Sequence, residues 1–345
     1  MNAAIAASWM AGLAAAALAA GARGTAGGGQ AAARPTGRSL SAPAAAPAAG
    51  QAAPFPPLTK ACFNANGTFN HENIAAEQRK RAAIVGEALG SRFDAAETLH
   101  YLIFSNADAE RTRAFTEWAE PLYAGLQRQL NIDPKERAWD GKCIILLFAA
   151  RQEFIDFAAR FDKMDASGWQ AYYAAETAGR NYPILMHLCF PVGGRDLMSL
   201  QNYFVHEGTH AFFRTYRGSV RLPLWLDEGL SEYMMVYNDP SLRAAKRAPA
   251  EAAARAGKPI ADILEYPSTA VLTLEEYSVC YTLADLLLSR SGPRTKDFVE
   301  ALKRRQPQGS AIQTSFGFDL AGMEERWRAS LTGESGPGKR RPRNR

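Results

Sequence analysis

Two histidines stand four residues apart, with a glutamate between them, where the sequence runs His206-Glu207-Gly208-Thr209-His210. In an α-helix, residues i and i+4 lie on the same face, so the imidazoles of His206 and His210 can bind one zinc ion. Glu207 then lies beside the metal, where its carboxylate can take a proton from zinc-bound water. The alternative is a helix that carries two ordinary histidines and an exposed glutamate. We expect a zinc site, with Glu207 as the catalytic base.

A catalytic zinc ion needs a third protein ligand and an open position for water. Glu228 stands eighteen residues after His210, in the segment with the sequence WLDEGLSEY at 225–233. An H-E-x-x-H motif followed by W-L-x-E-G-x-x-E-Y resembles the gluzincins, the thermolysin-like metallopeptidases, and among them the peptidase-MA-like branch of uncharacterised bacterial proteins. The resemblance implies that Glu228 is the third ligand. Because no histidine follows His210, the three-histidine metzincins are excluded.

The resemblance also implies a fold and an activity. The expected fold is α+β and zincin-like, with a small mixed sheet and its edge strand above the active-site helix, followed by a mainly helical lower lobe. The expected peptidase domain covers residues 58–332, with an upper lobe at 58–217 and a helical lobe at 218–332. The expected activity is zinc-dependent hydrolysis of peptide bonds in a peptide or protein substrate.

A tyrosine-bearing helix is expected after residue 273. Thr273 and Glu276 have the spacing of a capping box, which predicts a helix that begins there. Tyr277 and Tyr281 follow at one-turn spacing, a pattern that by itself indicates core packing. The resemblance adds a role, because gluzincins similar to aminopeptidases use a tyrosine at this place to donate a hydrogen bond to the oxyanion. It implies Tyr277 as that donor, with Tyr281 as the fallback.

Residues 71–190 show an α/β pattern. Helical periodicity covers 72–89, 109–130 and 152–161, and apolar runs at 100–104, 143–148 and 182–190 are typical of buried strands. The last run directly precedes the zinc helix, in a sheet whose edge strand can pair with an extended peptide. Aminopeptidases of this clan carry a G-x-M-E-N motif on the edge strand, and residues 181–190 contain no acidic residue. We therefore expect an endopeptidase, or an unusual exopeptidase, rather than a typical aminopeptidase.

Several residues near the motifs allow two interpretations. Gly229 either permits close approach to the zinc helix or is merely tolerated inside its own helix. Glu232 lies one turn after Glu228 and either supports a zinc-binding imidazole or is a solvated charge. The other three histidines are interpreted as core or surface residues and not as ligands: His71, His100 and His187.

The two ends of the chain have a different composition from the rest. Residues 1–22 are apolar and rich in alanine, which indicates a signal peptide and an exported protein, with an uncleaved membrane anchor as the alternative. Residues 23–57 predict a disordered linker rich in alanine, proline and glycine, and residues 333–345 a basic disordered tail. Four widely spaced cysteines form no zinc pattern and could pair or stay as buried thiols.

The distribution of charge along the chain indicates whether a nucleic acid is an expected partner. The formal net charge is +5, but eight positive charges lie in the terminal segments, which leaves residues 39–338 at about −3. A basic core that would indicate a nucleic-acid partner is therefore absent from the sequence. Two functional classes remain open: a zinc peptidase, or a catalytically silent peptidase-like fold that serves as an extracytoplasmic binding or structural module. Glu207 favours the peptidase, because a silent module would not need the base.

Overall fold

Apolar runs form the centre of a five-stranded mixed sheet. The structure is a computed structural model that describes residues 55–177 and 182–333. Three parallel strands, β2 (Tyr101–Ser105), β3 (Cys143–Phe148) and β5 (Leu185–Pro191), are buried along their whole length. The antiparallel strands β1 (Asp94–Glu97) and β4 (Tyr172–Glu176) lie at the two edges, in the order β1-β2-β3-β5-β4. Buried parallel strands require cover on both faces of the sheet.

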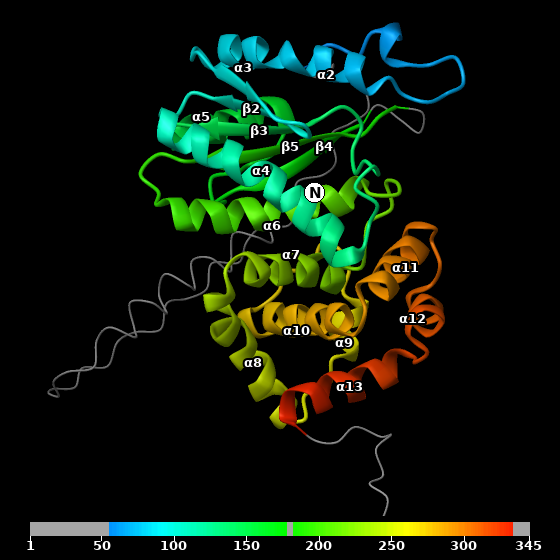
Figure 1. Ribbon diagram of the computed structural model, residues 1–345. Helices are drawn as coiled ribbons and strands as arrows, with labels where there is room; N and C mark the ends of the chain where they lie inside the picture. Colours follow the sequence, from blue (N-terminus) through cyan, green and yellow to red (C-terminus); the bar gives the residue numbers. More distant parts are fainter. Residues whose placement is uncertain (1–54, 178–181, 334–345) are drawn as a thin grey trace, which may run out of the picture.

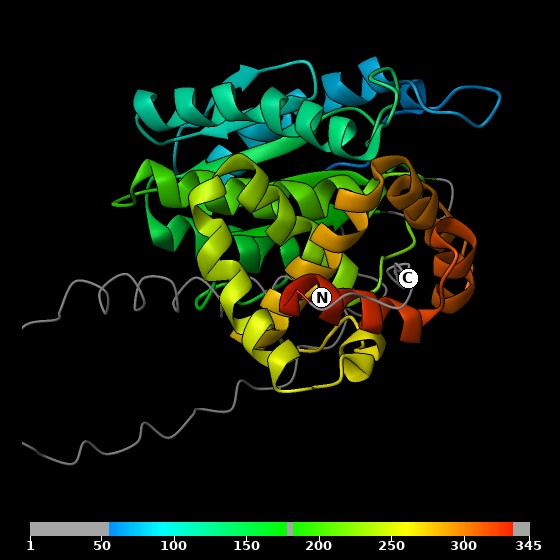
Figure 2. The same ribbon diagram turned by 60° about the horizontal axis from the view of Figure 1, so that its bottom comes forward.

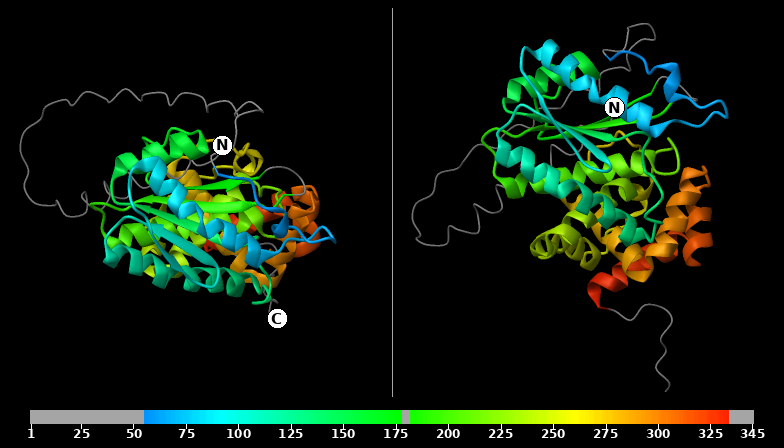
Figure 3. Two further views of the ribbon diagram at one scale, coloured as in Figure 1. Left: turned by 90° about the horizontal axis from the view of Figure 1, so that it is seen from above. Right: turned by 45° about the horizontal axis from the view of Figure 1, so that its top comes forward.

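Helices supply that cover. Alternate strand residues such as Leu146 and Cys189 pack against α3 (Arg81–Leu89) and α5 (Arg151–Phe157) on one face. Their neighbours on the strands pack against α4 (Ala109–Leu130) and α6 (Leu197–Thr215) on the other. Figure 3 shows α3 running across the outer side of the sheet together with α2 (His71–Arg79). The layer of α4 and α6 separates the sheet from the C-terminal helices (Figure 1).

The C-terminal half is helical. Helix α7 (Leu224–Asn238) follows α6 and packs against it and against α10 (Leu274–Arg290). Around these two helices lie five others (Figure 2): α8 (Arg243–Arg255), α9 (Ala261–Glu265), α11 (Gly292–Lys303), α12 (Gln308–Phe316) and α13 (Leu320–Thr332). Short turns of helix stand at η1 (Lys60–Cys62), η2 (Ala158–Asp162) and η3 (Pro240–Leu242). The arrangement confirms a mixed α+β protein with a small mixed sheet and a helical C-terminal part.

The start of α10 and the closing helix form as expected. Thr273 Oγ1 accepts a hydrogen bond from the Glu276 amide at 3.3 Å, and Glu276 Oε2 accepts one from the Thr273 amide at 2.6 Å, which confirms the capping box. Trp327 of α13 is buried, and its indole donates to Thr282 Oγ1 on α10 at 2.8 Å. Both contacts fix α10, the helix that carries Tyr277.

Two expectations for the first half are wrong. The helix expected over 72–89 is two helices, because the amide of Lys80 bonds back to the carbonyl of Glu77, three residues earlier, and tightens the turn. The strand expected at 182–190 is the interior strand β5, and the edge strand on that side is β4. The edge strand does carry an acid, Glu176, but its carboxylate pairs with Arg81 of α3 at 2.6 Å, on the face away from α6.

Four observations concern the ends of the chain, the cysteines and the membrane. The predicted signal peptide, most of the predicted linker and nearly all of the basic tail lie outside the described residues. Phe55 nevertheless packs on Phe161 with 4.9 Å between ring centroids, so the packed chain begins before residue 58. All four cysteines are buried free thiols. Within residues 55–177 and 182–333, no helix has the length and apolar character needed to cross a membrane.

Candidate metal centre

Close packing of α6 fixes the position of the histidine pair. The helix begins at Asp196, whose side chain accepts a hydrogen bond from the Ser199 amide at 2.8 Å. Gly208, inside the H-E-x-x-H motif, faces α4, and a β-carbon there would lie 2.6 Å from Leu122 Cδ2. The glycine therefore lets α6 press against α4 while the opposite side of the helix turns its histidines toward α7.

His206, His210 and Glu228 come together as the sequence predicts. The Nε2 atoms of the two histidines lie 3.1 Å apart, and Glu228 Oε2 lies 3.5 Å from each of them. Ligands at 2.0–2.1 Å from a tetrahedral ion are separated by about 3.3–3.4 Å. Glu228 Oε2 is buried and has no hydrogen-bond partner among the described residues. The three atoms therefore form a site that can hold a metal ion.

Two further carboxylates lie behind the imidazoles, within ion-pair distance. Glu232 Oε1 lies 3.2 Å from His206 Nδ1, and Asp227 Oδ2 lies 3.2 Å from His210 Nδ1. A carboxylate next to Nδ1 favours the proton on that nitrogen, which leaves Nε2 free to bind a metal. Burial lowers the pKa of His210, but the negative charges of Asp227 and Glu228 outweigh it, so the net pKa is well above its ordinary value.

The solvated interpretation of Glu232 is wrong, because its side chain is only 1% exposed. It also accepts a hydrogen bond from Lys246 of α8, whose side chain is completely buried. Burial raises the pKa of Glu232, yet the charges of Lys246 and His206 more than offset this and hold the pKa below its usual value. Lys246 is missed by sequence reasoning, because no local spacing relates residue 246 to the metal motif.

Glu207, the residue expected to be the base, lies between the two histidines in the sequence. It is buried, and its Oε1 atom has no hydrogen-bond partner among the described residues. Burial raises the pKa of Glu207, with His206 and His210 acting in the opposite direction. A carboxylate with a raised pKa and an unpaired oxygen can accept a proton more readily than one on the protein surface.

The two tyrosines of α10 lie in different surroundings. Burial raises the pKa of Tyr277, and the next contributions come from the charges of Glu228 and Glu232. The pKa of Tyr281 is raised to about 12, first by burial and then by the charge of Asp285, away from the histidine pair. The roles of the two tyrosines stay predictions.

Gly229 permits a close approach, but to a different helix from the one expected. A β-carbon on Gly229 would lie 2.3 Å from the carbonyl oxygen of Cys280 and 3.2 Å from Ala284 Cβ, both on α10. The expectation that it faces the zinc helix is wrong, because Glu228 already occupies the α6 side of α7. Gly229 thus sets the distance between the helix of Glu228 and the helix of Tyr277.

The edge strand covers the centre. The ring of Tyr173 on β4 stacks on His210 with 5.3 Å between centroids, a contact that sequence reasoning misses because β4 itself is missed. The side chains of His206, His210 and Glu228 are each only 4% exposed. Burial raises the pKa of Tyr173 to about 12, with Asp227 contributing in the same direction.

The remaining histidines have protein partners, and the interpretation that none of them binds a metal stays a prediction. His100 Nδ1 lies 2.6 Å from Glu120 Oε2, and His71 Nδ1 accepts a hydrogen bond from the Gly141 amide at 3.2 Å. His187 Nε2 lies 2.9 Å from Asp162 Oδ2, close to Cys189 on the other face of the sheet. Asp162 also accepts a hydrogen bond from the Tyr172 hydroxyl at 2.7 Å. The ligand atoms of Asp162, His187 and Cys189 lie within 4.8 Å of one another, so this group too could hold a metal ion.

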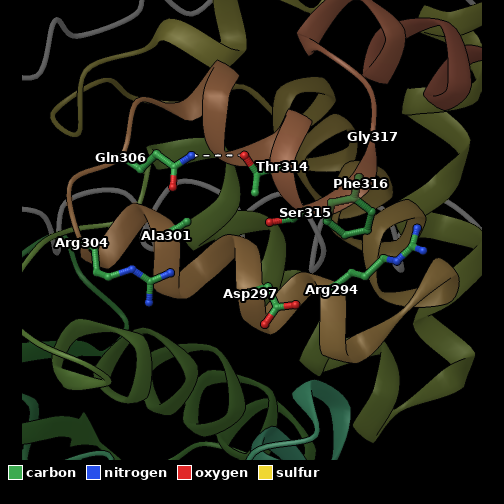
Figure 4. Close-up of a pocket in the computed structure, with 9 residues that line it drawn as sticks. All are labelled: Arg294, Asp297, Ala301, Arg304, Gln306, Thr314, Ser315, Phe316 and Gly317. Atoms are coloured by element: carbon green, nitrogen blue, oxygen red, sulfur yellow. Dashed lines mark hydrogen bonds between the residues drawn. The ribbon is translucent and has the colours of Figure 1, made fainter.

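A surface hollow lies elsewhere, between α11 and α12, and has a volume of about 750 Å³ (Figure 4). Its wall includes Arg294, Asp297, Arg304 and Phe316, and contains none of the residues of the candidate metal centre. The hollow is therefore separate from the chemistry that the sequence predicts.

Comparison with models of protein families and with curated proteins found no match for this chain. The gluzincin resemblance consequently rests on the residues of the two motifs and on the order of the elements. The structure brings the residues of both motifs together at one buried site that can hold a metal ion.

Proposed function

We propose that this chain is a zinc-dependent peptidase with a zincin-like fold, in which His206, His210 and Glu228 hold the metal. The observation that carries the proposal is the spacing of the three ligand atoms, 3.1 Å and twice 3.5 Å. Two nitrogens and one carboxylate oxygen are a ligand set typical of catalytic zinc. Asp227 and Glu232 behind the imidazoles support the same assignment.

When bound, zinc lowers the pKa of a coordinated water and polarises a carbonyl oxygen. The protein supplies the proton transfer, since Glu207 stands beside the ligands, takes a proton from the nucleophile and passes it to the leaving amine. Its unpaired Oε1 atom is the acceptor. The Tyr277 hydroxyl donates a hydrogen bond to the carbonyl oxygen as negative charge develops there.

The alternative function is a catalytically silent peptidase-like module in which the metal is structural. The exposed fraction of 4% for each ligand side chain favours it, because structural zinc sites are closed and catalytic sites keep an open position. Three protein ligands and the unpaired carboxylate oxygen of Glu207 favour the peptidase. In the peptidase, Tyr173 and the edge strand must move or rotate to admit a substrate.

The substitution Glu207→Gln separates the two functions. The amide keeps the size of the side chain but cannot take the proton, so hydrolysis of a broad peptide library falls by at least about a hundredfold while zinc content stays near one per chain. Glu325→Gln, on the far helix α13, is the matched control and leaves both quantities unchanged. If the wild type and Glu207→Gln hydrolyse the peptides equally, the peptidase proposal is rejected. It is also rejected if the zinc-loaded wild type hydrolyses none of them. The silent module then remains as the function.

A further inference from the structure

A second feature lies next to the metal centre, on the side of His210. Arg214 follows His210 by one helical turn, so the two side chains leave α6 on the same face. Its Nη1 donates to the carbonyl of Ser219 at 2.7 Å, which holds the guanidinium in place. Its Nε atom is buried and has no hydrogen-bond partner among the described residues. The guanidinium is therefore held in place and keeps hydrogen-bonding capacity that no described residue fills.

Arg221 brings a second guanidinium close to the first. It lies on the segment between α6 and α7 and is exposed. The hydrogen bond from Arg214 to Ser219 ends two residues before Arg221, so the Arg214 guanidinium lies against the segment that carries Arg221. The charge of Arg221 also contributes to lowering the pKa of Arg214, after burial. Within the described part of the chain, neither forms an ion pair with a carboxylate. Two neighbouring positive charges repel each other, and a bound anion removes this repulsion.

Lys303 of α11 fixes the backbone that carries Arg221. Its buried ammonium donates to the carbonyl of Phe213 at the end of α6, and to those of Val220 at 2.7 Å and Gly218 at 3.3 Å in the connecting segment. Lys303 thereby adds a third positive charge and holds the segment rigidly against α6. A rigid backbone lets Arg221 meet a ligand with little loss of conformational freedom.

Acidic groups do not balance this charge. Asp227 is the carboxylate whose charge acts on Arg214 and on Lys303, and it lies 3.2 Å from His210 Nδ1. One carboxylate shared with an imidazole therefore faces three positive groups. These positive groups lie on the side of His210 that faces Asp227.

We propose that Arg214 and Arg221 bind a carboxylate of the peptide substrate, so that the protein prefers acidic peptides. This inference rests on the proposed peptidase function and adds its substrate class. Guanidinium groups match a carboxylate with two parallel hydrogen bonds and keep their charge at every physiological pH. The carboxylate comes from an aspartate or glutamate side chain or from the C-terminus of the peptide, and the chemistry of recognition is the same.

Binding to zinc-loaded Glu207→Gln tests the proposal without turnover. The probes are fluorescein-labelled hexapeptides that carry glutamate or glutamine at one scanned position, each with a free or an amidated C-terminus. We expect one acidic probe to bind at least about tenfold more tightly than its amide partner, a difference of about 1.4 kcal/mol. If glutamate probes bind more tightly with either form of the C-terminus, the bound carboxylate belongs to a side chain. If only the probes with a free C-terminus bind more tightly, the bound carboxylate is the terminal one.

Arginine variants assign the preference to the two residues. Arg221→Met and Arg214→Met each reduce it, and together they bring the acidic and amide probes to within about twofold of each other. Arg217→Met is the matched control, because Arg217 on the same segment pairs with Glu136 at 2.7 Å and Glu300 at 3.3 Å. Arg221→Glu, at an exposed position where folding is preserved, reverses the preference toward a lysine probe.

The outcomes separate this inference from the proposed function. Equal binding of every acidic and amide pair, or a preference that survives the double substitution, overturns the carboxylate site even if the wild type hydrolyses peptides. Acid-selective binding that depends on Arg214 and Arg221 supports the site even if the wild type hydrolyses none of them, and in that case only the peptidase function fails.

Discussion

Lys246→Met leaves Glu232 as a buried carboxylate without its ammonium partner. The two side chains are 0% and 1% exposed, so water cannot replace the lost interaction. Breaking a buried ion pair by removing one partner typically costs about 3–5 kcal/mol, because the remaining charge stays desolvated. We expect a loss of this size in the free energy of unfolding, measured by urea denaturation in EDTA so that metal binding does not contribute.

The double variant Lys246→Met with Glu232→Gln isolates the cause. It removes both charges and leaves an amide of the same size beside His206, so we expect it to recover at least ~2 kcal/mol of the loss. Lys258→Met is the matched control, since Lys258 and Glu275 are 55% and 39% exposed, and such a surface pair contributes about 0–1 kcal/mol. A loss below about 1 kcal/mol for Lys246→Met, or no recovery in the double variant, refutes the assignment of a buried ion pair behind His206.

Three further predictions follow from the centre. Gly229→Ala places a β-carbon 2.3 Å from the Cys280 carbonyl, so the free energy of unfolding falls by about 1–3 kcal/mol in urea denaturation; an unchanged midpoint contradicts the close approach. Tyr277→Phe lowers kcat by about a hundredfold to a thousandfold, and Tyr281→Phe changes it by less than about twofold; the reverse order exchanges their roles. Zinc stabilises the folded state, so EDTA lowers the urea midpoint of the wild type, and an equal response of Glu228→Gln excludes Glu228 as a ligand.

The metal motif and the strongest apolar runs are predictable from sequence for physical reasons. His206 and His210 meet because helical periodicity alone places residues i and i+4 on one face. Strands β2 and β3 consist of buried apolar residues, as expected for parallel strands covered on both sides. The capping box at Thr273 forms because the hydrogen bonds are local and need no other part of the fold.

What the sequence does not reveal depends on contacts between distant segments. Strand β4 reads Tyr-Tyr-Ala-Ala-Glu and has neither the alternation of a half-buried strand nor a long apolar run. Its identity as the edge strand comes from pairing with β5, which no local pattern encodes. Lys246 reaches Glu232 from α8, and Gly229 faces α10, because of how the helices stack. The sequence pattern shows that these residues lie on helices but not which helix each one faces.

Zinc-edge X-ray absorption on the purified, zinc-loaded protein, combined with its zinc content, tests the central claim most directly. We expect one zinc per chain, with two imidazole nitrogens at about 2.0–2.1 Å and a carboxylate oxygen at about 2.0–2.2 Å from the metal. The zinc and these ligands are lost when His206 and His210 are both replaced by alanine. A zinc content near zero after zinc loading and dialysis contradicts the claim. So does a spectrum dominated by sulfur at about 2.3 Å that the double substitution leaves unchanged.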